Sequence, residues 1–267
     1  MKAYKVLSLL VLLIGLLALL GLVYTPYDPY VTNEAAILQA PSMAHWLGTD
    51  MHGRDVLSRI MAGASTSIYG SLFIVLMARM IGTVLGTLAA YKGGWMDAVI
   101  MRMTDLFLAF PDFLLAITVA GVLGGGLSQA IIAIIATSWT QYARLSRALV
   151  KGELSAPYMT MAKLSGVPLI KQWIYYILPN MGSVILITGL LHIATTMMMI
   201  AGLSFIGLGV QVPEPEWGAM ISDGVALLPI APWVSLAPSL ALALVMCITN
   251  AWGDAMRDYL DKGDSNE

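Results

Sequence analysis

Arg79, Asp105 and Asp112 interrupt the apolar stretches of this 267-residue chain, and they are the first candidates for chemistry. Arg79 stands in the middle of one apolar run, where a charge costs about 2.5–3.5 kcal/mol on an insertion scale. We therefore expect it to face other helices or a polar pathway, with an acid as partner. Asp105 and Asp112 are seven residues apart, so a helix would place them on one face. These charges either line a pathway for cations or form ion pairs between helices, and the second hypothesis is favoured.

The histidines are the next candidates, because imidazole is a common ligand of transition metals. His45, His52 and His192 do not have the spacing of a closed ligand set. We therefore expect structural roles for them and predict no metal site. The methionine run 197–199 would point to different faces of a helix, which favours packing and lipid contact over copper binding.

Nucleotide chemistry is excluded by a missing motif. The chain contains no Gly-x-x-x-x-Gly-Lys-Ser/Thr loop, the backbone cradle that holds the phosphates of ATP. It therefore cannot hydrolyse ATP by itself. We predict no catalytic residue and no cofactor bound by this chain.

The composition indicates whether the chain folds in water or in a lipid membrane. Hydrophobic residues make up 58% of it and charged residues 11%, whereas soluble domains carry roughly a quarter charged residues. So few charges cannot cover the surface of a soluble protein. A soluble enzyme, a nucleic-acid binder and a disordered chain are excluded, and the single Cys247 excludes a disulfide framework.

The apolar runs predict an all-α membrane bundle of six transmembrane helices. A span needs about 20 apolar residues, and Gly124-Gly125-Gly126 separates the third span from the fourth. A signal peptide competes for the first run, but no small-residue cleavage site follows it. The predicted spans cover residues 6–23, 68–91, 98–123, 127–142, 182–209 and 234–252.

Basic residues predict the orientation. With the N-terminus in the cytoplasm, eleven lysines and arginines lie inside and only Arg54 and Arg59 lie outside, as the positive-inside rule requires. Both termini are then cytoplasmic. The outer segment 210–232 carries Glu214, Glu216 and Asp223, which would favour a cationic cargo or contact another protein.

The segment of residues 143–178, between the fourth and fifth spans, is longer and contains more predicted structure than a simple connecting loop requires. Pro157 is tolerated in the first turn of a short helix, and Gly166 is suited to the left-handed position that ends it. A second short helix would run from residue 169 to 178, closed by Pro179. This elbow would expose Tyr158, Met161 and Leu164, which would be buried against a partner protein or against lipid headgroups. The residues alone do not decide between these two.

The elbow resembles the EAA loop of membrane subunits of bacterial ABC importers. The match consists of Ala162-Lys163-Leu164-Ser165-Gly166 followed by Leu178-Pro179. It is partial, because Thr160 stands where that family usually has glutamate, Met161 where it has alanine and Tyr176 where it has isoleucine. These departures affect the polar anchor of the motif and leave its geometry intact.

Further stretches narrow the resemblance to the dipeptide/oligopeptide/nickel permeases, and within them to the C-type subunit, including its nickel branch. They occur in order along nearly the whole chain. The stretches are HWLGTD (45–50), GRDVLSR (53–59), GGWMD (93–97), LAFP (108–111), LSFIGLGV (203–210), WGAM (217–220) and GDAMRDYLD (253–261).

The resemblance implies a multi-pass protein of the bacterial plasma membrane that forms half of a translocation pathway. The implied partners are a second permease subunit, two cytoplasmic ATP-binding subunits, an extracytoplasmic substrate-binding protein and membrane lipid, with no nucleic acid. The chain would divide into an N-terminal helix with an outer segment (1–67), a permease core (68–254) and a cytoplasmic tail (255–267). The residues that would dock on an ATPase subunit are Tyr158, Met161, Ala162, Leu164, Gly166 and Pro179.

The sequence indicates the transported substrate less clearly than it indicates the transport mechanism. Small similarities favour nickel or a nickel chelate, and a dipeptide or oligopeptide is the alternative. A proton-coupled transporter that uses Asp105 and Asp112 as relays is a second alternative, although the elbow argues against it. Residues that could line the pathway are Arg79, Asp105, Asp112 and Glu216.

Overall fold

The computed structural model describes the backbone of residues 2–264 and the side chains of residues 4–260 except residue 169. This part of the chain is helical, as predicted, and its β-structure amounts to one isolated bridge between Thr49 and Asp55. The elements are α1 (Lys2–Val23), η1 (Glu34–Ala36), α2 (Val56–Lys92), α3 (Gly94–Leu108), α4 (Asp112–Val122), α5 (Leu127–Ser155), α6 (Pro157–Leu164), α7 (Leu169–Gln172), η2 (Trp173–Ile177), α8 (Leu178–Phe205), α9 (Trp217–Val225) and α10 (Trp233–Asp264).

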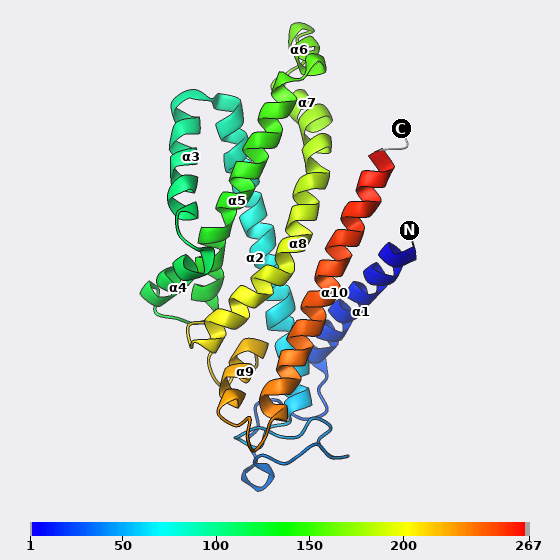
Figure 1. Cartoon of the computed structure of the whole chain (residues 1–267), viewed down its shortest axis with the longest axis vertical. Coiled ribbons are helices and arrows are strands. Elements are labelled where there is room, and N and C mark those ends of the chain that lie inside the picture. Colours follow the sequence, from blue (N-terminus) through cyan, green and yellow to red (C-terminus); the bar gives the residue numbers. More distant parts are fainter. Residues whose placement is uncertain (1, 265–267) are drawn as a thin grey trace.

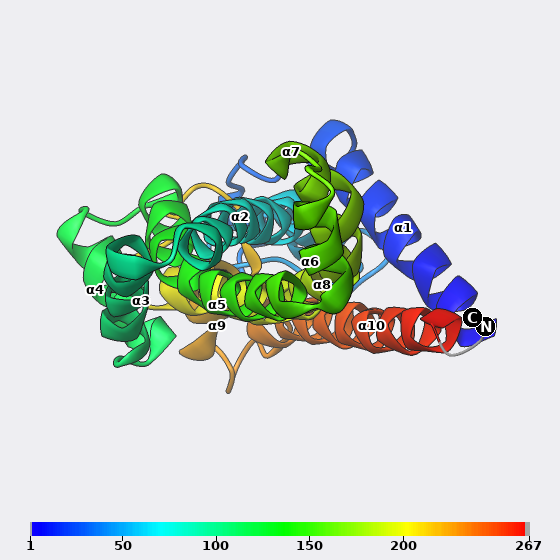
Figure 2. The same cartoon turned by 90° about the horizontal axis from the view of Figure 1, so that it is seen from above.

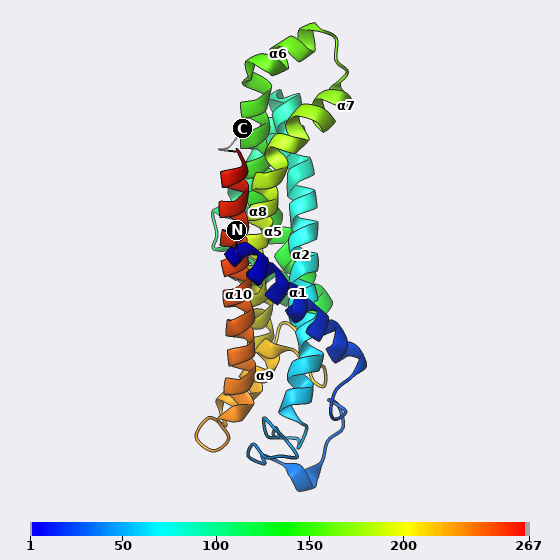
Figure 3. The ribbon, with the colours of Figure 1, turned by 90° about the vertical axis from the view of Figure 1, so that its right-hand side faces the viewer.

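The helices form an elongated bundle with two different ends (Figure 1). The short helices α6 and α7 form an arch at one end, beyond the other helices, and both termini point toward that end (Figures 1 and 3). The segment between α1 and α2 and the short helix α9 lie at the opposite end. Seen from above, α2, α5 and α8 lie together, while α3 and α4 lie to one side and α1 and α10 to the other (Figure 2).

The number of spans differs from the six that the sequence predicts. By length and apolar content, four stretches among the described residues can cross a membrane: residues 4–23, 56–92, 170–205 and 233–260. The pair α3 and α4 adds a fifth if this bent pair counts as one span. The predicted fourth span belongs to α5, which is 29 residues long but is too polar to join this set.

The predicted third span, residues 98–123, is broken. Its two halves, α3 and α4, meet at 93°, and Pro111 occupies the N-cap of α4. Proline lacks an N–H and disfavours a helical residue before it, so the helix ends in front of Pro111. The break turns α4 away from the direction of α3 (Figure 1).

Two predicted boundaries fall inside helices. The predicted division at residue 67, between the outer segment and the permease core, lies within α2, which is 37 residues long. The predicted tail from residue 255 continues α10 as far as Asp264. Residues 265–267 of that tail lie outside the described residues.

Helices α2 and α5 pack at a distance that only glycine allows. A Cβ atom at Gly82 would lie 2.3 Å from the Trp139 carbonyl oxygen, and one at Gly86 would lie 2.1 Å from the Ala143 carbonyl oxygen. The two glycines are four residues apart on one face of α2, the small-residue spacing that lets helices approach closely in membranes. This contact fixes α5, the most polar of the long helices, against the apolar α2.

We predict that Gly86→Ala destabilises the protein by about 1–3 kcal/mol, because the new methyl group forces the α2 and α5 backbones apart. Gly182→Ala is the matched control, since a Cβ atom there has no neighbour within 4 Å. Thermal unfolding in detergent measures both variants. Equal midpoints would contradict the packing described for α2 and α5.

Candidate functional site

The arch at one end of the bundle is built around Gly166. Its φ of +71° is left-handed, a conformation that glycine adopts without a Cβ clash. The N–H of Val167 donates to the Ala162 carbonyl (3.1 Å) and that of Gly166 to the Lys163 carbonyl (3.1 Å), the two bonds of a Schellman motif. The predicted end of the first short helix at Gly166 is therefore confirmed.

The inner side of the arch is packed against the bundle. Met159, Ala162 and Ile177 are buried, and the first and third join one apolar cluster with Val150 of α5 and Met181 of α8. Ala162 was expected to contact an ATPase subunit, but its burial shows that it faces inward. The small side chain lets α6 lie close to the structure beneath it.

The outer side of the arch exposes apolar side chains. Met161 is 63% exposed and Leu164 is 78% exposed, and neighbouring apolar side chains left uncovered in this way mark sites that contact a partner or a membrane. Tyr158 is also exposed, but its ring lies 6.0 Å from that of Tyr176 and its hydroxyl group bonds to Glu153. The arch is therefore a stiff structure with an uncovered apolar surface.

The helix predicted to close at Pro179 does not close there. The chain passes through the π-helical turn η2, in which the Leu178 N–H bonds to the Trp173 carbonyl, and continues as α8. Pro179 falls in the first turn of α8, where a missing N–H is tolerated. The arch is consequently joined without a break to α8 and directly to α5.

A seam of polar contacts joins α3 and α4 to α5. Arg147 and Lys151 bond to Asp97, the lysine at 2.8 Å. Arg144 Nη2 donates to Asp105 Oδ1 at 2.6 Å, and Gln141 Nε2 donates to Asp112 Oδ2 at 2.5 Å. These α5 residues are three or four positions apart and so share one face. The structure thus places Asp105 and Asp112 in contacts between helices.

The Asp105–Arg144 pair differs from the rest of the seam in its exposure. Both side chains are 53% exposed, whereas the Asp97 side chain is 14% exposed. An exposed pair of charges in contact with lipid has a high free-energy cost. The pair therefore needs water or another polar surface on its open side.

Arg79 has no acidic partner, in contrast to what the sequence led us to expect. Among the described side chains, no carboxylate lies within 4.0 Å of its guanidinium group. Arg79 is half-buried and lies across Gly189 of α8, where a Cβ atom would be 3.5 Å from its Cδ and 3.6 Å from its Nη1.

Glu216 was expected to line the pathway, and this expectation is wrong for the described structure. Its side chain is fully buried. One carboxylate oxygen accepts a bond from the Ser67 hydroxyl (3.0 Å) and the other from the Ala219 N–H (3.0 Å). Glu216 is the N-cap of α9 and ties it to α2, a role that the separation of 149 residues from Ser67 hides from sequence analysis.

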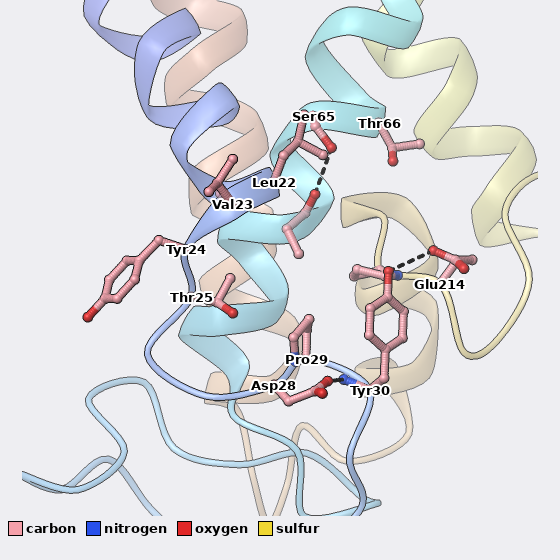
Figure 4. A pocket seen from close by; sticks show the side chains of 13 residues that line it. Leu22, Val23, Tyr24, Thr25, Asp28, Pro29, Tyr30, Ser65, Thr66 and Glu214 are labelled. Carbon is pink, nitrogen blue, oxygen red and sulfur yellow. Dashed lines mark hydrogen bonds between the residues drawn. The ribbon is translucent and has the colours of Figure 1, made fainter.

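A pocket of about 520 Å³ opens at the end opposite the arch (Figure 4). It lies between the end of α1, the segment after it, α2 and Glu214. The Tyr30 hydroxyl donates to Glu214 Oε2 at 3.0 Å, and burial together with this acidic neighbour raises the pKa of Tyr30. A second pocket of about 410 Å³ shares Thr66 and Glu214 with the first and reaches Gly125 and Gln211.

The outer segment before α2 is held by buried charges, which the sequence placed on the outer side without indicating their burial. Arg54 Nε lies 2.7 Å from Asp50 Oδ2, and Arg59 Nε lies 3.5 Å from the same oxygen. Both arginines are buried. His45 Nδ1 lies 2.9 Å from Asp55 Oδ1, the structural role expected of it. Nearby, burial raises the pKa of Asp223, and the charge of Arg59 opposes that shift.

Metal ligands do not converge in the part of the chain that the structure describes. Within that part, no three histidine, cysteine or acidic side chains form a group that could hold a metal ion. His45 is occupied by Asp55, His52 contacts Arg54, and the His192 ring packs edge-on against Tyr142 with centroids 5.2 Å apart.

Comparison with known proteins gives a consistent result. The family described as "Binding-protein-dependent transport system inner membrane component" matches residues 82–263. The chain is 40% identical over 230 residues to the dipeptide transport system permease protein DppC of Alkalihalophilus pseudofirmus, covering 86% of this chain and 76% of that protein.

Two glutathione transport system permease proteins, both named GsiD, are similarly related. The protein of Pectobacterium atrosepticum is 42% identical over 228 residues, which cover 84% of this chain and 74% of the relative. That of Escherichia coli O157:H7 is 39% identical over 221 residues, which cover 83% and 73%.

The family match confirms that this is a multi-pass inner membrane permease subunit without a catalytic domain or cofactor, in a system whose ATP is hydrolysed by partner subunits. It also confirms the resemblance inferred from the loop and from the ordered motifs. The chain belongs to the family of inner membrane components of binding-protein-dependent transport systems.

Proposed function

We propose that this chain is the membrane-spanning subunit of an ATP-driven importer for small peptides, a dipeptide or a tripeptide such as glutathione. The observation that carries the proposal is about 40% identity, over more than four-fifths of the chain, to permeases named for dipeptide and glutathione transport. These names favour the peptide alternative over the nickel cargo expected from the sequence. The pockets around Glu214 are consistent with a cargo that carries an ammonium group.

The proposed complex contains a second permease subunit, two cytoplasmic ATP-binding subunits and an extracytoplasmic binding protein. In this arrangement the arch and both termini are cytoplasmic, and the pockets near Glu214 face the binding protein. Six spans result if α3 with α4 counts as one and α5 as another. Helix α5 can lie in the membrane because α3 and α4 pack against its polar face.

The arch is proposed to receive the motion of an ATP-binding subunit. Tyr158, Met161, Leu164 and Gly166 lie on its outer side, where a groove of that subunit would cover the exposed apolar groups. Pro179, at the start of α8, joins the arch to the bundle. Because α5 is fixed to α2 by the glycine contact, movement of the arch would shift α2, α5 and α8 together.

The exposed Asp105–Arg144 pair is proposed to face the water-filled pathway between the two permease subunits. Lipid on its open side would leave two charges without solvation, and water removes that cost. Asp112 lies on the same seam but is bonded to Gln141, so we assign it mainly to the α4–α5 contact.

We predict that Gly166→Val uncouples transport from ATP hydrolysis while the protein still inserts and assembles. Valine is strained at a φ of +71°, so the arch would change shape where the ATPase subunit docks. Peptide uptake per ATP hydrolysed, measured in proteoliposomes of the assembled complex, should fall at least about tenfold, an estimate based on a docking loss of some 1.4 kcal/mol.

The matched control is Gly152→Val, at a position on α5 with no neighbour within 4 Å of a Cβ atom. It should leave the ratio of uptake to hydrolysis within about twofold of the wild type, because an exposed helical site away from special features tolerates substitution. A normal ratio in Gly166→Val would refute the docking role of the arch.

We predict that the assembled complex takes up radiolabelled dipeptide or glutathione only with ATP, and that nickel does not compete. Uptake is measured with ATP, with a proton gradient in place of ATP, and with excess Ni²⁺. Uptake of labelled nickel that peptides do not displace would overturn the peptide proposal. Uptake driven by the proton gradient alone would overturn the ATP-driven mechanism.

A further inference from the structure

Arg79 is a charged residue of the bundle whose surroundings are incomplete. The charged groups of the seam between α5 and the pair α3 and α4 are, in contrast, paired with groups of opposite charge or with an amide. Arg79 lies on α2 against α8 and is half-buried, yet no described carboxylate reaches it. A guanidinium group carries five N–H donors and cannot lose its charge in a protein.

A second donor close to Arg79 also lacks an acceptor. The Tyr142 side chain on α5 is 1% exposed, and its hydroxyl group has no hydrogen-bond partner among the described residues. Gly82 lies one turn along α2 from Arg79, and a Cβ atom there would be 2.6 Å from the Cβ atom of Tyr142, so Tyr142 packs against α2 within one turn of Arg79. A buried hydroxyl group without a partner costs about 1–3 kcal/mol and calls for an explanation.

The neighbouring side chains do not supply the missing acceptor. The Gln141 Nε2 group donates to Asp112 and the His192 ring lies edge-on to the Tyr142 ring, and neither side chain accepts a hydrogen bond from the Tyr142 hydroxyl group. A Cβ atom at Gly189 of α8 would lie in ordinary van der Waals contact with the Arg79 side chain. Arg79 on α2 and Tyr142 on α5 are therefore neighbouring donors without a described acceptor, and a group that accepts hydrogen bonds and carries negative charge would satisfy both.

We propose that Arg79 and the Tyr142 hydroxyl group form a binding site for the carboxylate of the transported peptide. A carboxylate pairs with guanidinium through charge-assisted bonds and can accept a bond from a phenol at the same time. Peptides supply such a group at the C-terminus. The inference rests on the proposed peptide transport and adds to it the part of the cargo that is recognised inside the membrane.

The test compares a radiolabelled dipeptide with its C-terminal amide in proteoliposomes of the assembled complex at saturating binding protein. Each variant is compared with the wild type for the same peptide, so the preference of the binding protein cancels. Arg79→Gln should lower uptake of the free acid at least about tenfold and that of the amide less than about twofold, because a charge-assisted bond is lost only for the acid. Arg79→Lys should lie between wild type and Arg79→Gln.

Tyr142→Phe provides a second variant that does not change charge. Removal of a buried hydroxyl group that has no ligand would be neutral or stabilising. The proposal instead expects a selective loss of acid uptake, about threefold or more, with unchanged stability. Lys92→Gln is the control for the loss of a positive charge on α2, at its exposed end, and should transport both peptides normally.

The remaining outcomes are also decisive. If the wild type does not transport the amide, the comparison of acid with amide is replaced by the ratio of peptide transported to ATP hydrolysed. This ratio must then fall in Arg79→Gln, while the ATP hydrolysis stimulated by the binding protein persists. Equal loss of both peptides, or loss of the second permease subunit on purification, would assign the missing carboxylate to a protein partner and overturn the inference. A wild-type complex that carries no peptide would refute the proposed function, whereas normal uptake by Arg79→Gln would refute this inference alone.

Discussion

The close contact between α2 and α5 is the constraint on which the rest of the bundle depends. Helix α5 is the long helix that lacks the apolar content of a membrane span, so its position relies on its neighbours. Gly82 and Gly86 allow the α2 backbone to meet the α5 backbone directly, and dispersion forces over that contact replace the missing affinity for lipid. With α5 in place, its opposite face presents the polar groups that hold α3 and α4.

The same helix connects the two parts of the molecule that are proposed to act in transport. At one end α5 leads into the arch, and Gly166 and the turn η2 return the chain into α8 without a flexible connection. In its middle it contributes Arg144 to the exposed pair and Tyr142 to the incomplete site beside Arg79. A displacement of the arch would therefore reach both groups through α5, because a packed helix moves as a unit.

Local signals in the sequence predicted the parts of the structure that local forces determine. The glycine at the end of α6 depends on residue type and short spacing. The pairing of Asp105 was expected from its charge, although its partner Arg144 lies 39 positions away, and the break at Pro111 interrupts a span that was predicted to be continuous. Pro179 was misinterpreted because a π-helical turn before it accommodates the ring, and this turn has no clear sequence signature. The family resemblance predicted the class of protein, as the comparisons later confirmed.

Contacts between distant residues could not be predicted in the same way. The burial of Glu216 depends on Ser67, and that of Arg59 on Asp50 and on the Pro29 carbonyl. Sequence analysis therefore expected Glu216 to line the pathway and placed Arg59 on the outer side without a buried partner. For Arg79 the error was the opposite one. The free-energy cost of a charge in the membrane led us to expect an acidic partner, and no described side chain provides it.

The central claim is that α2 and α5 move as one body while the transporter works. Spin labels at Leu88→Cys on α2 and Gly152→Cys on α5, with Cys247→Ser to remove the only native cysteine, report the distance between the two helices in the assembled complex. Pulsed electron paramagnetic resonance measures this distance in the nucleotide-free state and in the ATP-trapped state. The account predicts that this distance stays within about 1–2 Å, and a change near one helical turn, about 5 Å, would contradict it.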